Sequence, residues 1–155
     1  MRIACASDAH GATRKIDRLV ENMPPIDSFI FLGDCDRDAV YISYALSEIQ
    51  PQVSFHAVCG NNDPFSKLPG TLLLWLGNTR AFITHGHLFQ VKTSLQRLQA
   101  ETTRHDCSLA LFGHTHHPLI TQTETCLFVN PGALQNGEWA FLDIGEEVHA
   151  ALQVL

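Results

Sequence analysis

Short apolar runs alternate with amphipathic stretches in the first part of the chain. The runs predicted as buried strands are residues 3–6, 29–32 and 53–58. The stretches predicted as helices lie between them, at residues 13–23 and 36–49. Ile16, Leu19 and Val20 share one face of the first helix, and Pro24 ends it. This β-α-β-α-β order predicts parallel strands joined by crossover helices.

The second part of the chain has shorter elements. Gly77-Asn78 separates apolar runs at residues 72–75 and 81–84, which indicates a hairpin. A helix is predicted over residues 91–102, with Leu98 facing inward. The other apolar runs are predicted strands, at residues 109–112, 119–121, 127–129, 139–143 and 148–154. Since we find no linker and no internal repeat, we expect residues 1–155 to form one mixed α/β domain.

Polar residues follow five of the predicted strands directly. They are Asp8 and His10, then Asp34, then Asn61, then His85, and finally His114 and His116. Because ligands bind at the carboxyl ends of strands in open α/β sheets, we expect these side chains to meet at one edge. Side chains two residues apart in an extended segment point the same way. On this basis Asp8 and His10 can converge, as can His114 and His116.

This set of side chains has the composition of a metal site. Two carboxylates, one amide and four imidazoles suit two divalent ions that share a carboxylate. The mixture of nitrogen and oxygen favours borderline ions, with Mn first and Ni, Fe, Co and Zn as alternatives. Each fragment alone is more often a loop or turn, and buried polar residues plus turns are the alternative for the whole set. The placement of all five fragments at strand ends favours the metal site.

Composition narrows the classes of function. The net charge of −6 and the dispersed basic residues argue against tight binding of nucleic acid. No apolar run approaches the ~20 residues that span a bilayer, so we expect no membrane segment. The five cysteines are scattered without a Cys-x-x-Cys pair, which favours reduced thiols and a cytoplasmic location.

The five fragments together resemble a known family. The order Asp-x-His, Gly-Asp, Gly-Asn-x-Asp, His-Gly and Gly-His-x-His is similar to the calcineurin-like metallophosphoesterase superfamily. The short chain and Asn130-Pro131-Gly132-Ala133 resemble its compact bacterial and archaeal phosphodiesterase branch. The resemblance implies a four-layer α/β/β/α sandwich with a di-metal centre. It also implies ligands for the first metal (Asp8, His10, His116), ligands for the second (Asn61, His85, His114), and Asp34 as the bridge.

Two residues are candidates for direct catalytic roles. In many members of the superfamily, a histidine at the position of Asn62 is thought to assist the reacting phosphate or protonate the leaving group. Asn62 does not titrate near neutral pH, so we expect activity to favour diesters with good leaving groups. His87, two residues beyond His85, is a candidate substitute acid, with an ordinary loop residue as the alternative.

The predicted function is therefore hydrolysis of small phosphodiesters by a hydroxide that bridges two metal ions. A nuclease or phosphomonoesterase with the same centre is an alternative. Another is a non-catalytic scaffold, as in eukaryotic relatives such as the small subunit of retromer, which have lost part of the ligand set. We expect a small-molecule phosphoester as the substrate, and the oligomeric state is left open, with a homo-oligomer as one option.

Overall fold

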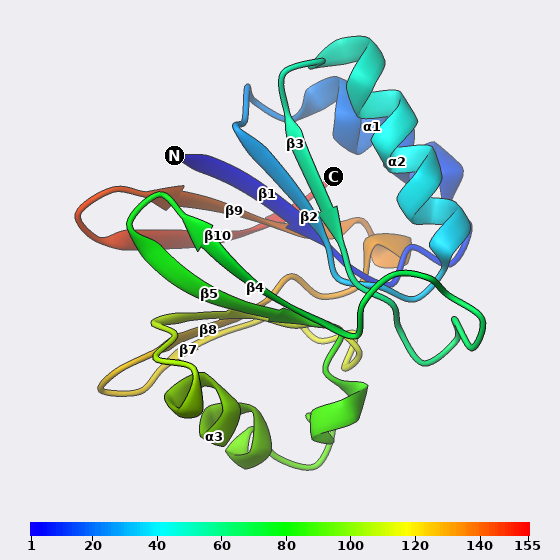
Figure 1. Ribbon diagram of the computed structural model, residues 1–155. Helices are drawn as coiled ribbons and strands as arrows, with labels where there is room; N and C mark the ends of the chain where they lie inside the picture. Colours follow the sequence, from blue (N-terminus) through cyan, green and yellow to red (C-terminus); the bar gives the residue numbers. More distant parts are fainter.

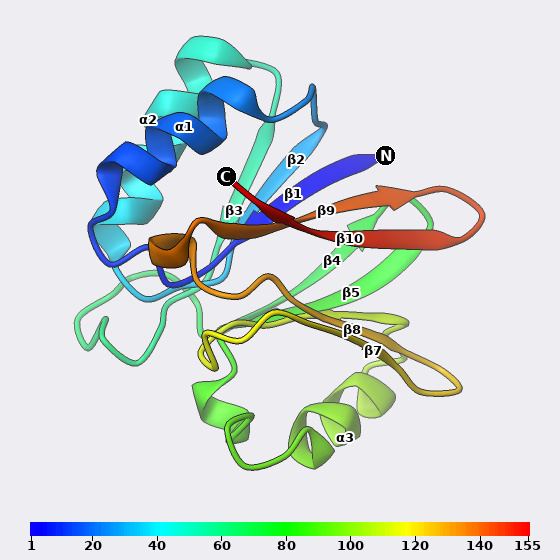
Figure 2. The ribbon, with the colours of Figure 1, turned by 180° about the vertical axis from the view of Figure 1, so that it is seen from behind.

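The predicted β-α-β-α-β order is present at the start of the chain. The computed structural model describes residues 1–155. Parallel strands β1 (Arg2–Ala6), β2 (Ser28–Phe31) and β3 (Ser54–Ala57) lie side by side. Helices α1 (Thr13–Asn22) and α2 (Asp36–Ile49) connect them. β9 (Glu138–Ile144) pairs antiparallel with β1, and β10 (Val148–Val154) pairs antiparallel with β9. The order of the sheet is β10-β9-β1-β2-β3 (Figure 2).

A second five-stranded sheet forms from the middle of the chain, in the order β4-β5-β6-β8-β7. Its strands are β4 (Thr71–Leu76), β5 (Thr79–Thr84), β6 (Leu109–Leu111), β7 (Leu119–Gln122) and β8 (Leu127–Asn130). β4 and β5 form the predicted hairpin, and β5, β6 and β8 are parallel. Helix α3 (Gln96–Arg104) lies outside this sheet, and the short 3₁₀ helices are His87–Phe89 and Leu134–Asn136.

The sheets pack face to face between the helices, so that α1 and α2, the first sheet, the second sheet and α3 form four layers (Figure 1). This confirms the predicted α/β/β/α sandwich. β1 shows how the packing is encoded: Ile3 and Cys5 face the other sheet, whereas Ala4 and Ala6 face the helices. Because both faces of β1 are covered, its sequence is a continuous apolar run without alternation.

One predicted helix begins later than expected, and another has apolar residues on its solvent face. The helix expected over residues 91–102 begins only at Gln96. Gln90 adopts a left-handed conformation and Val91 packs against Gly86, so the chain turns before the helix starts. In α2, the apolar residues Val40, Tyr44 and Ile49 face solvent. The buried face is made by Ala39, Ile42 and Leu46.

The parallel strands end at one side of the sandwich, which positions their following loops together (Figure 1). All five cysteines are unpaired. None of the three α-helices has the length and hydropathy needed to cross a bilayer.

Candidate metal centre

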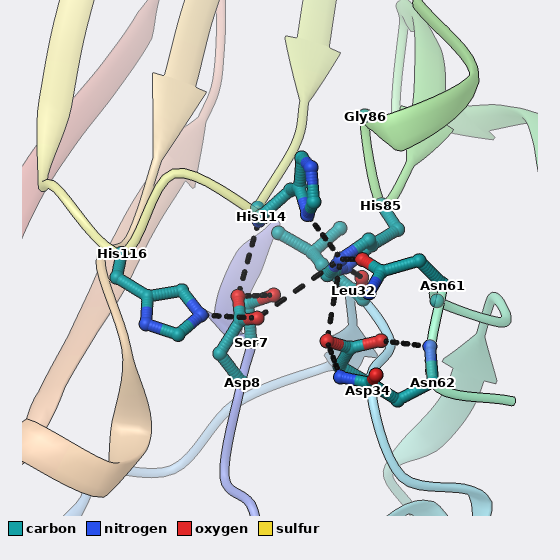
Figure 3. Close-up of polar contacts among 12 residues, drawn as sticks. Ser7, Asp8, Leu32, Asp34, Asn61, Asn62, His85, Gly86, His114 and His116 are labelled. Atoms are coloured by element: carbon teal, nitrogen blue, oxygen red, sulfur yellow. Dashed lines mark hydrogen bonds and ion pairs between the residues drawn. The ribbon is translucent and has the colours of Figure 1, made fainter. Parts of the chain in front are cut away.

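The loops after β1, β2, β3, β5 and β6 bring the predicted ligands together (Figure 3). We call Asp8, His10 and His116 the first subsite. We call Asp34, Asn61, His85 and His114 the second subsite. The residues come from five loops far apart in sequence, and the sheet ends are what place them at one edge.

In the first subsite, one carboxylate oxygen has no hydrogen-bond partner and is free to bind a cation. Asp8 Oδ2 accepts hydrogen bonds from Ser7 Oγ at 2.6 Å and from the backbone N–H of His114 at 3.1 Å. Asp8 Oδ1 is buried without a hydrogen bond. It lies 3.0 Å from His116 Nε2 and 3.7 Å from His10 Nε2. A buried unpaired carboxylate oxygen facing two imidazoles fits a divalent cation, since burying the charge alone is costly.

The second subsite is organised around His85, which is completely buried. Its Nδ1–H donates to the backbone oxygen of Leu32 at 2.7 Å, which leaves Nε2 as the ring atom that can bind a metal. That atom lies 3.2 Å from Asn61 Oδ1, 3.2 Å from His114 Nδ1 and 3.7 Å from Asp34 Oδ2. Asn61 Oδ1, His114 Nδ1 and Asp34 Oδ2 thus surround His85 Nε2 as further candidate ligand atoms.

The two subsites meet at Asp8. Candidate ligand atoms of Asp8, His10 and His116 lie within 4.8 Å of one another, as do those of Asp8, Asp34 and His85. Figure 3 places Asp8 between His116 on one side and His85 on the other. The donors are imidazole nitrogens and carboxylate or amide oxygens, so the residues present fit borderline divalent ions.

Burial favours the neutral form of His114, which is the form that binds a metal. Burial, followed by the neighbouring His85 ring, lowers the pKa of His114 to about 4. Lys92 lowers this pKa further, whereas Asp8 and Asp34 oppose the shift. In the absence of a metal, the ring is therefore neutral at physiological pH and its Nδ1 can donate a lone pair.

Backbone strain concentrates at the ligands. Asp8, His10, Asp34, His114 and His116 all have positive φ, between 48° and 68°. L-residues adopt this region reluctantly, and such strain is typically found at functional sites. The extended geometry expected for the paired ligands is therefore wrong. Although Asp8 and His10 do approach each other, His114 faces His85 while His116 faces Asp8.

Two glycines permit the close approach of these loops. A side chain on Gly60 would collide with the Asp34 carboxylate, and one on Gly113 would collide with the Ser7 hydroxyl. Both positions therefore exclude any larger residue, because the loops from different strands touch there.

Asparagine and aspartate side chains hold the Asp34 loop. Asn62 donates to Asp34 twice, from its backbone N–H to Oδ1 at 2.8 Å and from its side-chain amide to Oδ2 at 2.7 Å. The Asp63 carboxylate accepts the backbone N–H groups of Cys35, Asp36 and Gly60. Asn62 thus orients a predicted ligand, and Asp63 fixes its own turn and the start of α2.

His87 lies against the second subsite. Its ring centroid is 5.4 Å from that of His85 and 6.1 Å from that of His114. Burial, and then His85, lower the pKa of His87, while Asp34 and Asp63 oppose the shift. The neutral ring is therefore favoured at pH 7. It can donate a hydrogen bond to a substrate oxygen but is a weak acid, so its role as proton donor stays a prediction.

The sequence gives no signal for two residues that contact the ligand loops, Gln135 and Lys15. The side-chain amide of Gln135 lies 3.2 Å from His116 Nδ1. The backbone N–H of Gln135 donates to the backbone oxygen of Asp8 at 3.2 Å. Lys15 Nζ donates to the backbone oxygen of Gln135. Asn130 donates to the backbone oxygen of Gly113 at 2.9 Å. No local spacing signals the Gln135 contact, because the residue lies in the loop after a different strand.

The fold and this site agree with a comparison against protein families. The family model for the calcineurin-like phosphoesterase superfamily domain matches residues 1–143. The chain belongs to this superfamily, and its Asp and His groups have the positions of candidate metal ligands.

Individual relatives include enzymes and a sorting protein. Phosphodiesterase YfcE of Escherichia coli K12 is 28% identical over 155 residues, covering 86% of this chain and 79% of that protein. Vacuolar protein sorting-associated protein 29 of Schizosaccharomyces pombe is 30% identical over 110 residues, covering 70% of this chain and 56% of that protein. A crystal structure of a predicted phosphoesterase from Streptococcus pneumoniae has a TM-score of 0.80 and 24% identity, covering 99% of this chain and 88% of that one.

Proposed function

We propose that this chain is a metal-dependent phosphodiesterase that hydrolyses small phosphodiesters at a centre of two divalent ions, with Mn²⁺ as the first choice. The observation that carries this proposal is the close approach of candidate ligand atoms in the two subsites. Asp8 Oδ1 is buried without a partner, and His85 Nε2 faces Asn61 Oδ1 and His114 Nδ1 at 3.2 Å each. The phosphodiesterase name of one relative supports the choice of reaction.

When bound, two divalent ions supply Lewis acidity at phosphorus and lower the pKa of a water molecule toward neutrality. The chain's own residues set up the rest of the reaction. Asp34 is the proposed bridging ligand, and Asn62 holds both of its oxygens by hydrogen bonds. The two carboxylates of the ligand set neutralise only half the charge of two divalent ions, so an anionic diester is attracted.

The leaving group is the expected limit on activity. Asn62 donates to Asp34 and does not titrate, and the neutral His87 ring is a weak acid. Without a strong acid beside the ester, departure of a poor leaving group is slow, since general acid catalysis contributes about 10²–10⁴-fold. We therefore expect aryl diesters to be hydrolysed faster than alkyl phosphate monoesters.

The test is metal analysis together with turnover of bis(p-nitrophenyl) phosphate. We expect about two metal equivalents per chain and hydrolysis with Mn²⁺, at least about 10³-fold faster than by Asp34→Asn. The matched control is the urea denaturation of metal-free Asp34→Asn, which should resemble that of the wild type. Full activity in Asp34→Asn contradicts the bridging role. No bound metal and no hydrolysis with Mn, Ni, Fe, Co or Zn would indicate a scaffold.

A further inference from the structure

A cavity of about 640 Å³ opens beside the candidate metal centre. Its lining includes His10, a predicted ligand, and Asn62, which contacts Asp34, together with Arg37, Phe65 and Ser66. The wall made by Arg37, Phe65 and Ser66 comes from the start of α2 and from the loop between β3 and β4, which lie close together at one end of α2 (Figure 1). Its volume is in the range of small-ligand sites.

The ring of Phe65 stands in this wall almost completely open to solvent. The residue is 96% exposed, more than any other large apolar residue of the chain. A phenylalanine in a folded protein normally buries most of its ring. Because the ring of Phe65 stays in solvent, it adds little to the stability of the fold. On its other side Phe65 borders an apolar groove along α2 that includes Tyr44.

The two carboxylates of the cavity accept hydrogen bonds, whereas its one arginine has no partner. The Asp63 carboxylate accepts three backbone N–H groups, and Asp36 Oδ1 accepts the Ser66 hydroxyl at 2.8 Å. Arg37 is exposed and makes no ion pair. Besides these carboxylates, of which Asp36 keeps one oxygen without a hydrogen bond, the cavity offers a ligand an unpaired guanidinium and an exposed aromatic face. A ligand complementary to them carries an anion and a planar ring.

We propose that this cavity binds one ester arm of the substrate, and that this arm carries a planar aromatic ring that stacks on Phe65. Arg37 pairs with the phosphate anion, whatever group the phosphate carries. The inference rests on the proposed phosphodiesterase activity and narrows its substrate class to aryl or nucleoside phosphodiesters. Stacking on Phe65 selects the ring, because a base or an aryl group presents a flat face of matching size.

Binding of three phosphorus ligands to the Mn-loaded protein tests the proposal by calorimetry. Methylphosphonate has no ring, phenylphosphonate has an aryl ring, and thymidine 5′-phosphate has a nucleobase. We expect the two ring-bearing ligands to bind about tenfold more tightly than methylphosphonate. If phenylphosphonate and thymidine 5′-phosphate gain the same affinity over methylphosphonate, any planar ring suffices. A larger gain in affinity for thymidine 5′-phosphate assigns the site to nucleosides.

Variants locate the effect. The ring preference is the ratio of the affinity for a ring-bearing ligand to that for methylphosphonate. Phe65→Ser should reduce this ratio to about one without changing the affinity for methylphosphonate, and Phe65→Trp should preserve the ratio. Both changes lie at a fully exposed position, so the fold tolerates them. Arg37→Ala should weaken all three ligands by a similar factor, with partial rescue by Arg37→Lys. Tyr44→Ser is the matched control, because Tyr44 lies in the groove along α2 and does not line the cavity.

Two outcomes would overturn the inference. One is equal binding of methyl- and phenylphosphonate by the wild type. The other is a ring preference that survives Phe65→Ser or is lost in Tyr44→Ser. Because these are binding measurements, they are separate from the proposed function: a protein that hydrolyses bis(p-nitrophenyl) phosphate without any ring preference loses only the cavity assignment.

Discussion

The two subsites of the candidate metal centre are held in different ways. In the first, the side chains of His10 and His116 are 27% and 35% exposed, and His116 is oriented by the amide of Gln135. In the second, the side chain of His85 is 0% exposed, and its ring is tied to the backbone oxygen of Leu32. A backbone contact inside the core cannot move without moving the sheet, whereas a side-chain contact at the surface can.

This difference teaches that the second subsite is anchored to the core through His85, while the first is completed by partly exposed imidazoles. Rigid ligands lose less conformational entropy on binding a metal. We therefore expect the second subsite to bind its ion more tightly, and substitutions there to disturb the fold as well as the chemistry.

The largest expected contrast is between His85→Gln and His10→Gln. His85→Gln removes a ligand and the bond to Leu32, so we expect a loss of activity of about 10³-fold. It should also lower the unfolding free energy of the metal-free protein by about 1–3 kcal/mol. His10→Gln should change that free energy by less than about 0.5 kcal/mol. Urea denaturation with a chelator present measures the unfolding free energy of both variants. Equal losses of unfolding free energy would contradict the contrast.

Stepwise removal of metal should separate the subsites. During titration of Mn-loaded protein with a chelator, we expect one ion to leave first, with an affinity difference of about tenfold or more. The weaker step belongs to the first subsite, so His10→Gln should abolish it and leave the tighter step. Manganese magnetic resonance or metal analysis after gel filtration follows the two steps. Loss of the tighter step in His10→Gln would reverse the ranking.

Gln135 should influence the first subsite alone. In the metal-free structure Gln135 Nε2 lies 3.2 Å from His116 Nδ1. A metal on His116 Nε2 requires the proton on Nδ1, so the amide of Gln135 must then turn to present its oxygen to that N–H. Gln135→Leu should weaken the first ion by about 10–100-fold without changing the second. Gln135→Glu retains an oxygen acceptor and should bind metal at least as well as the wild type. Weak binding by Gln135→Glu would show that Gln135 does not accept this proton.

The smallest expected effect is a pH dependence in the metal-free protein. The folded-state pKa of His114 is lowered from 6.5 to about 4 by burial. Between these values the unfolded chain binds more protons than the folded one, so stability falls as pH falls through this window. His114→Gln removes the group and should reduce that fall. Denaturation with a chelator at pH 7.5 and 5 compares the two proteins, and identical pH dependence would argue against desolvation of the ring.

Most elements of the fold could be predicted from local patterns. The apolar runs of β1 and β2 and the Gly77-Asn78 turn are encoded within a few residues. The start of α3 and the outward face of α2 were not predictable in this way. Both depend on packing against distant segments: Val91 meets Gly86, and Ala39 faces the sheet in place of Val40.

The candidate ligands could also be named from the sequence, because each one follows an apolar strand. Their detailed geometry could not. The left-handed backbone of Asp8 and His116 directs the side chains away from the extended arrangement. The double hydrogen bond from Asn62 to Asp34 joins the loops of two strands, and no spacing within either loop indicates it.

By itself, the sequence determined the mixed α/β class and the donor atoms available at the strand ends, since hydrophobic period and residue chemistry are local properties. The tertiary structure alone decided which imidazole faces which subsite, how Gln135 reaches His116, and why Phe65 stays in solvent. Those facts depend on distances between segments that only meet after folding, when the two sheets bring their loops to a common edge.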